Sequence, residues 1–244
     1  MNFKKIKNIF NKKKGIFVSK LSPKDHELIL NLVEQHFSHL TSEIKSKEKI
    51  NLDNYLTHAK NTDHASLFNK LNRMLPEESV KIIEHETELF SSLRGIFPEL
   101  IITDEENLGY NNIYWRLVRP LPYIDVGSMH KDKWFWDLNK RKIDKKFQRF
   151  KLWVSLINET EKLGFKYVDG SADIDFKFKS EKKEVERPII DEEMLKRFKT
   201  TSLAGSKGDF IIFHDEILHG GELLDGKKCR LSAEFTFLVK KINF

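Results

Sequence analysis

The spacing of the apolar residues changes near Asn111, and this change constrains the fold more than any other feature of the sequence. Before it, apolar residues recur at helical spacing, which predicts helices that begin at Ser22, near Asp63 and at Glu77, the last reaching Leu93. Helices followed by many strands predict an α+β chain whose second half is a sandwich or a barrel. Strands are predicted where short apolar or alternating runs are separated by turns, at 113–118, 150–157, 165–168, 174–178, 210–213 and 231–239.

The two longest strand runs have faces of different character. In the first, apolar residues alternate with Lys151, Trp153 and Ser155. Because successive side chains of a strand point to opposite faces, such a strand has one apolar face and one mixed face. The last run places one set of side chains on an apolar side and another on a polar side, and from alternation alone the polar side would face solvent. The apolar set is Leu231, Ala233, Phe235, Phe237 and Val239, and the polar set is Arg230, Ser232, Glu234 and Thr236.

A length of 244 residues suits one domain, or one domain with an elaborated end. We expect a basic tail over residues 1–20 and a single domain over 21–244, with a helical part over about 21–105 and a strand-rich core over about 110–244. A charge-dense insertion at about 179–199 is either a solvated surface segment or a lid over the mouth of the barrel. The single cysteine, Cys229, cannot form an internal disulfide, which favours a cytoplasmic location.

The net charge of +6 belongs to the N-terminal tail rather than to a binding face. The remaining chain is close to neutral, so we expect no nucleic-acid partner. The tail is either a solvated end or a weak contact with an anionic membrane, since Phe3, Ile6, Ile9 and Phe10 interleave with its lysines at roughly helical spacing. Its positive charges are Lys4, Lys5, Lys7, Lys12, Lys13 and Lys14, with no acidic residue before Asp25.

The triplet His130-Lys131-Asp132 is the most informative group of polar residues. On an extended segment its first and third side chains point the same way and can take adjacent positions on one metal ion. His219, followed by two glycines, is suited to be the third ligand. Two histidines and one carboxylate on one face of a metal are typical of non-haem iron(II) chemistry with oxygen. A rival triplet, His214-Asp215-Glu216, lies next to His219 and is ranked lower because the ordered motifs below favour the first set.

Beyond these residues, the region from about Tyr114 to Val239 resembles the phytanoyl-CoA dioxygenase-like branch of the iron(II)/2-oxoglutarate oxygenases. The resemblance rests on an ordered series in which the last arginine stands eleven residues after the distal histidine. In chain order the series is Met129-His130-Lys131-Asp132, Leu152-Trp153-Val154-Ser155-Leu156, Gly164-Phe165, Val168-Asp169-Gly170-Ser171, Gly208-Asp209-Phe210, Leu218-His219-Gly220-Gly221 and Arg230-Leu231-Ser232. The family often has a histidine after its Gly-Ser turn, and here that position is Ala172.

The resemblance implies a double-stranded β-helix, a jelly-roll or cupin-like core, with the N-terminal helices packed on it. It implies iron(II) bound by His130, Asp132 and His219, and 2-oxoglutarate as cosubstrate with O2. Arg230 would then point into the barrel and pair with the distal carboxylate of 2-oxoglutarate, with a hydroxyl donor from Ser232 and with Trp153 lining the cosubstrate site.

The function implied is hydroxylation of an unactivated carbon of a small-molecule substrate, with release of succinate and CO2. Related halogenases lack the carboxylate that is present here as Asp132. Arg116 and Arg119 precede the site, and we expect one of them to form an ordinary salt bridge while the other could bind an anionic substrate group. Two alternatives remain, a catalytically silent cupin-like binding module and a peripheral membrane protein that acts through its lysine tail.

Overall fold

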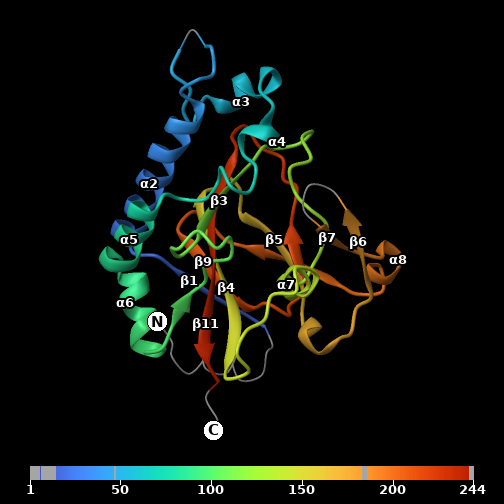
Figure 1. Ribbon diagram of the computed structural model, residues 1–244. Coiled ribbons are helices and arrows are strands. Elements are labelled where there is room, and N and C mark those ends of the chain that lie inside the picture. The colour runs from blue at the N-terminus through green and yellow to red at the C-terminus, as the bar shows by residue number, and fades with distance from the viewer. Residues whose placement is uncertain (1–5, 7–14, 47, 183–185, 242–244) are drawn as a thin grey trace.

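Two antiparallel sheets that face one another form the core of the protein (Figure 1). The computed structural model describes residue 6 and residues 15–46, 48–182 and 186–241. The main sheet runs β1 (Ile16–Lys20), β9 (Asp209–His214), β4 (Phe147–Ile157), β11 (Arg230–Lys240) and β2 (Ile101–Ile102), and β3 (Ile113–Val118) also pairs with β11. The second sheet runs β10 (His219–Gly221), β5 (Lys162–Val168) and β8 (Thr200–Ala204).

The helices between β1 and β2 pack on the main sheet, with α2, α5 and α6 along one side of it (Figure 1). They are α2 (Pro23–Thr41), α3 (Tyr55–His58), α4 (His64–Leu67), α5 (Glu77–Glu86) and α6 (Glu88–Ile96). Helix α2 starts as predicted, because the Ser22 hydroxyl accepts a hydrogen bond from the amide of Asp25 at 3.1 Å. The apolar faces of β4 and β11 pack against these helices, for example through Phe90 and Phe235, whose ring centroids lie 5.0 Å apart. None of the helices in the described ranges is long and apolar enough to cross a bilayer.

Local hydrogen bonds explain where the predicted elements were wrong. The helix expected from Glu77 to Leu93 is broken at Thr87, whose backbone is extended and whose hydroxyl caps α6 by accepting from Phe90 N at 3.3 Å. The strand expected at 174–178 is absent, and β6 (Phe178–Lys182) begins only at its end. The Lys131 ammonium donates to the carbonyl of Ile174 at 2.8 Å, so this carbonyl bonds to a side chain rather than to a neighbouring strand.

The predicted boundary of the basic tail was also wrong. Residues 16–20 were assigned to the tail, yet they form β1, which pairs with β9 at the edge of the main sheet. Ile6, the one described residue before Gly15, is fully buried in the main core. This side chain is therefore not available to a membrane surface, and the lysines of the tail, at positions 4–14, lie outside the described residues.

The charged insertion folds back onto the second sheet. β6 pairs with β7 (Glu186–Ile190), and α8 (Glu192–Leu195) begins after a cap at Asp191, where a short helix was expected. The rings of Trp134, in α7 (Asp132–Leu138), and Phe178 stack at 4.6 Å. The insertion is thus anchored by an apolar cluster that includes Met129 and Leu218, the residues just before His130 and His219.

The inner face of the main sheet turns toward the second sheet. Trp153 of β4 and Phe213 of β9 pack with Phe165 of β5 between the two layers. Because side chains alternate, the polar residues of β11 that alternation alone would expose to solvent also lie on this inner face. The interior of the core is therefore polar along one of its strands.

Candidate metal site

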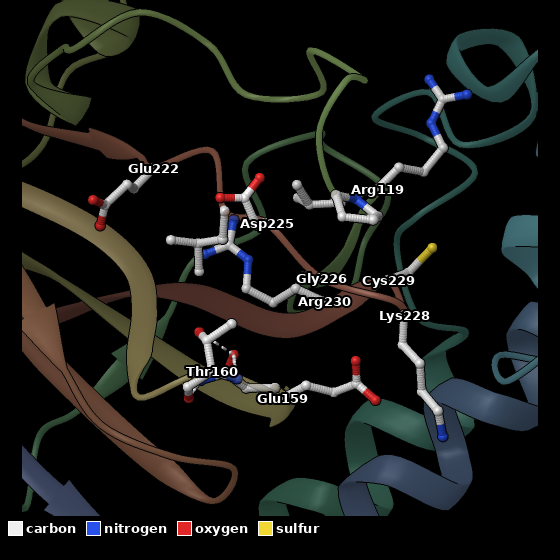
Figure 2. A pocket seen from close by; sticks show the side chains of 13 residues that line it. Arg119, Glu159, Thr160, Glu222, Asp225, Gly226, Lys228, Cys229 and Arg230 are labelled. Carbon is white, nitrogen blue, oxygen red and sulfur yellow. Dashed lines mark hydrogen bonds between the residues drawn. The ribbon is translucent and has the colours of Figure 1, made fainter.

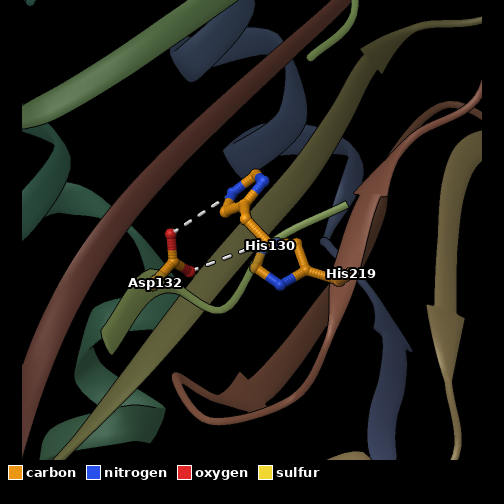
Figure 3. Close-up of side chains that lie close together, drawn as sticks. All are labelled: His130, Asp132 and His219. Atoms are coloured by element: carbon orange, nitrogen blue, oxygen red, sulfur yellow. Dashed lines mark ion pairs between the residues drawn. The ribbon is translucent and has the colours of Figure 1, made fainter. Parts of the chain in front are cut away.

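The backbone brings His130 and His219 side by side. The two residues form an isolated antiparallel bridge, in which His130 N donates to His219 O at 2.8 Å and His219 N donates to His130 O at 2.9 Å. Lys131 is extended, and Asp132 is the first residue of α7, so its side chain points back toward the two imidazoles (Figure 3). The structure thus brings together the three residues that the sequence predicted as ligands.

The geometry of the triplet leaves one nitrogen of each histidine free for a metal. Both Nδ1 atoms lie 2.9 Å from carbonyl oxygens, that of Ser128 for His130 and that of Ile217 for His219. Each Nδ1 therefore carries the proton, and each Nε2 has a lone pair. The Nε2 atoms lie 3.8 and 3.6 Å from the two carboxylate oxygens of Asp132, and the three ligand atoms lie within 4.8 Å of one another (Figure 3).

The electrostatics of the triplet suit a divalent cation. Burial lowers the pKa of His130 to about 4, with a further contribution from His219, so the imidazole is neutral near pH 7. Oδ2 of Asp132 is buried and has no hydrogen-bond partner among the described residues. A carboxylate that faces two imidazole lone pairs, and has a buried oxygen without a hydrogen bond, is a group that a cation would complete. The residues present therefore fit a metal ion, and the mixed nitrogen and oxygen donors are those of non-haem iron(II) sites.

Two aromatic rings, Phe165 and Phe213, to which the sequence analysis gave no role in the site, flank His219. The ring of Phe165 stacks on that of His219 at 5.4 Å and 13°, and Phe213 meets it edge-on at 4.6 Å. The ring centroid of Trp153 lies 6.0 Å from that of Phe165. The sequence signal for Phe165 and Phe213 was the alternation of side chains along β5 and β9. This alternation becomes informative only when it is known which face of each strand turns toward the other sheet.

Arg230 and Ser232 lie on the inner face of β11 but do not touch the triplet. Arg230 Nη1 donates to the carbonyl of Leu163 at 2.7 Å, and the guanidinium has no carboxylate partner among the described residues. Burial, and then the charge of Arg116, lower the pKa of Arg230 to about 10. The guanidinium crosses directly over Gly164, which has a φ of +68°, and a Cβ there would collide with it. This contact explains why glycine is needed at that position of the motif.

The cavity next to Arg230 is small. Figure 2 shows the guanidinium among the side chains that line it, together with Glu222, Asp225 and Thr160. Its volume is about 20 Å³, enough for one water molecule. Arg119, the other arginine considered from the sequence, is held by Asp125 through bonds of 2.8 and 2.7 Å, which makes it the structural member of the pair Arg116 and Arg119.

The two carboxylates of the rival triplet have other partners. Asp215 accepts two hydrogen bonds from Arg149, and its other oxygen lies 3.0 Å from His214 Nδ1. Glu216 pairs with Lys133 at 3.3 Å. The backbone carbonyl of Asp215 also accepts from the amide of Lys133, next to Asp132, at 3.2 Å. The two carboxylates therefore support the start of α7 rather than offering free ligands, although Nε2 of His214 is buried without a hydrogen-bond partner among the described residues.

Comparison with solved structures shows the same fold in enzymes of one kind. No protein-family model and no curated protein matches the sequence. The non-haem, alpha-ketoglutarate-dependent epimerase SnoN of nogalamycin biosynthesis matches with a TM-score of 0.54 and 9% identity, over 98% of this chain and 85% of its own. The carbocyclase SnoK of the same biosynthesis, also non-haem and alpha-ketoglutarate-dependent, matches with a TM-score of 0.54 and 11% identity, over 94% and 81%.

EctD from S. alaskensis, in complex with 2-oxoglutarate and 5-hydroxyectoine, matches with a TM-score of 0.50 and 12% identity, over 92% of this chain and 72% of its own. At these identities the similarity establishes the fold. The chain has the double-stranded β-helix core of the non-haem 2-oxoglutarate-dependent enzymes, with N-terminal helices packed on it, as predicted.

Proposed function

We propose that this protein is an iron(II)- and 2-oxoglutarate-dependent oxygenase that hydroxylates an unactivated carbon of a small-molecule substrate, with release of succinate and CO2. The observation that carries the proposal is the free donor set of His130, Asp132 and His219. We assign the chain to the phytanoyl-CoA dioxygenase-like branch on the ordered motifs between Met129 and Ser232. The fold hosts many substrates, so this branch does not name the substrate.

Three residues of the chain would hold the metal, and their backbone bonds pre-set its site. The carbonyls of Ser128 and Ile217 orient the two imidazoles, and the bridge between His130 and His219 keeps their spacing. When bound, iron(II) with 2-oxoglutarate and O2 supplies an oxidant able to attack an unactivated C–H bond. The part of the protein is to present two lone pairs and one carboxylate on a single face, which leaves the other face of the site for cosubstrate and substrate.

The same inner surface would hold the cosubstrate. Arg230 would bind the distal carboxylate of 2-oxoglutarate, because its guanidinium is buried and lacks a carboxylate partner among the described residues. Ser232 follows on the same face of β11 and can donate its hydroxyl. Trp153 and Phe165 would line this space and exclude water from it.

The outcome of the reaction is proposed from Asp132. Two structural neighbours are described as an epimerase and a carbocyclase, so the fold is compatible with oxidations other than hydroxylation. The intact carboxylate supports an oxidation without halide, since the related halogenases lack it. Hydroxylation is the outcome that needs no further group from the protein.

The location and the membrane contact are also proposals. Cys229 is buried, and burial raises the pKa of its thiol to about 12, which suits a reduced, inert thiol in the cytoplasm. We also propose a weak contact of the lysine tail with an anionic membrane, in addition to the oxygenase activity. A silent cupin-like module is the rival class, and the free ligand set argues against it.

Anaerobic titration of the protein with iron(II) and then 2-oxoglutarate tests the proposal. The expected result is a weak visible absorption band that appears only when both are present, followed by succinate formation when O2 is admitted. A protein that binds neither, or that binds iron without any change on addition of 2-oxoglutarate, would be a silent module instead.

A further inference from the structure

Charged and hydroxyl side chains gather on the inner face of the main sheet, between Arg230 and Asp132. The pairing of β11 with its two neighbours sets their positions. Ser232 lies opposite Arg116 of β3 and Ser155 of β4, and Thr236 lies opposite Lys151 of β4. Glu234 stands between these two levels, so Arg116 and Lys151 flank it from opposite sides of β11.

Several of these groups have no partner. In the described part of the chain, the side chains of Arg116, Lys151 and Glu234 make no hydrogen bond and no ion pair within 4.0 Å, although the Lys151 residue is only 7% exposed. The hydroxyls of Ser155 and Thr236 are buried without a partner as well. Together with Asp132 Oδ2, they make up three of the four buried side-chain atoms that lack a partner among the described residues. Groups of this kind, gathered on one surface, are typical of a site completed by a ligand or by water.

Lys151 and Glu234 are both held in their charged forms near neutral pH. Burial by itself would lower the pKa of Lys151, but Asp132 and Glu234 raise it above its ordinary value. Burial by itself would raise the pKa of Glu234, but Lys151 and then Arg116 lower it to about 2. The electrostatic potential at this surface is therefore positive, also at the carboxylate of Glu234.

The balance of charge leaves a positive excess after the cosubstrate is placed. Iron(II), Asp132, Arg230 and the two carboxylates of 2-oxoglutarate cancel one another. Arg116 and Lys151 then flank the single carboxylate of Glu234 on this surface. One negative charge on a bound molecule would complete the balance.

We propose that Arg116 and Lys151 form a second anion-binding subsite, distinct from the one assigned to Arg230, and that the substrate is a small molecule with a carboxylate or a phosphate group. The proposal rests on the oxygenase function, because the anion would orient the substrate beside the metal triplet. A guanidinium without a protein partner can bind either anion through two parallel hydrogen bonds. The hydroxyls of Ser155 and Thr236 supply further donors on the same surface.

Inorganic phosphate and acetate are the probes for this subsite, measured by calorimetric titration at low ionic strength. Titrations use the metal-free protein and the protein saturated with Co(II) and 2-oxoglutarate, which blocks the Arg230 position. We expect Arg116→Gln and Lys151→Met each to weaken phosphate binding about 10-fold or more in both forms, which is the loss of one charge-assisted hydrogen bond. Arg116→Lys should recover part of the affinity.

Arg119→Gln is the matched control. It removes the same charge three residues along the chain, but its guanidinium is already held by Asp125, so phosphate affinity should stay within about 2-fold. Arg230→Gln should weaken 2-oxoglutarate and leave phosphate binding to the loaded protein intact. Because Arg116 and Lys151 stabilise the charged form of Glu234, their variants are expected to unfold at a lower temperature than the wild type, and the titrations are made at a temperature where thermal unfolding shows each variant to be folded.

Two results would overturn the proposal. One is phosphate affinity that is unchanged in Arg116→Gln and Lys151→Met. The other is a loss of 2-oxoglutarate affinity in Arg116→Gln as large as that in Arg230→Gln, which would make Arg116 part of the cosubstrate site. If the protein bound no Co(II) or 2-oxoglutarate, the oxygenase function would fail, while the titration of the metal-free protein would still decide whether the anion subsite exists.

Discussion

The described part of the protein contains two groups of histidine and acidic residues that could hold a metal ion, and only one of them has a carboxylate without another partner. In the first, His130, Asp132 and His219, backbone carbonyls hold both Nδ1 atoms, and Oδ2 of Asp132 has no hydrogen-bond partner among the described residues. In the second, which contains Asp215, Arg149 and His214 take up the carboxylate. The two groups contain nearly the same residue types, so the partners of their carboxylates decide which group can bind a metal ion.

The comparison also separates two uses of a buried carboxylate. Asp215 stabilises the fold by joining β9 to β4 through Arg149, whose guanidinium also lies 4.0 Å from the centre of the Trp136 ring in α7. Oδ2 of Asp132 has no hydrogen-bond partner among the described residues, and we propose that this carboxylate serves a ligand rather than the fold. Variants of the two aspartates should therefore have opposite effects on stability and activity.

The largest effect is expected from the proposed ligands. His219→Ala should abolish succinate formation and weaken iron(II) binding by more than about 100-fold, beyond the effect of removing an outer partner of a ligand. His214→Ala is the matched control and should keep both iron(II) affinity and turnover. Equal losses in the two variants would mean that the second group takes part in binding the metal.

The second largest effect is on stability. Asp215→Asn should lower the free energy of unfolding by about 3–5 kcal/mol, because it leaves the buried guanidinium of Arg149 without a counter-charge. Asp132→Asn should change the stability of the metal-free protein by less than about 0.5 kcal/mol while it removes turnover. Urea unfolding of both variants measures the contrast, and a large destabilisation by Asp132→Asn would contradict it.

The third prediction compares two buried arginines. Arg149 is saturated by Asp215, whereas Arg230 bonds only to the carbonyl of Leu163, so only Arg230 is available to a cosubstrate. Arg230→Ala should weaken 2-oxoglutarate by about 2–5 kcal/mol, or roughly thirty-fold to several thousand-fold. Gly164→Ala should act in the same direction, because the added Cβ displaces the guanidinium. Unchanged 2-oxoglutarate affinity in Arg230→Ala would remove its assignment.

A smaller effect is expected in acid. Burial would raise the pKa of Asp215, but the hydrogen bond from His214 and the charge of Arg149 hold it below its ordinary value. A carboxyl with a depressed pKa stabilises the fold above its unfolded pKa of about 3.9, and this stability is lost as the pH falls toward the folded value. The free energy of unfolding of the wild type should thus fall more steeply below about pH 4 than that of Asp215→Asn. Parallel curves for the two proteins would contradict this use of Asp215.

The smallest effect is expected from the tail, which is part of neither group. Deletion of residues 1–14 should leave 2-oxoglutarate turnover unchanged, since every proposed ligand lies after residue 129. It should lower stability because the buried side chain of Ile6 is lost. Sedimentation with anionic vesicles tests the membrane contact, and equal sedimentation of the full-length and shortened proteins would exclude it.

Much of the architecture was predictable because it depends on local spacing. Alternation along 150–157 and 231–239 predicted the two central strands, and the Ser22 cap predicted the start of α2. The break at Thr87 was missed because the carboxylate of Asp25, more than sixty residues earlier, binds the amides of Glu88 and Leu89. Contacts across such separations cannot be inferred from the spacing of neighbouring residues.

The sequence by itself determined that the chain is α+β, that its last strand has one polar face, and that His130, Asp132, His219 and Arg230 follow one another in the order of a known motif. The tertiary structure decided that the polar face of β11 turns inward and that Arg149, 66 residues away in sequence, binds Asp215 and leaves Asp132 free. The physical reason is that a carboxylate becomes a ligand or a structural anchor according to the charges that surround it. Those charges come from strands that only folding brings together.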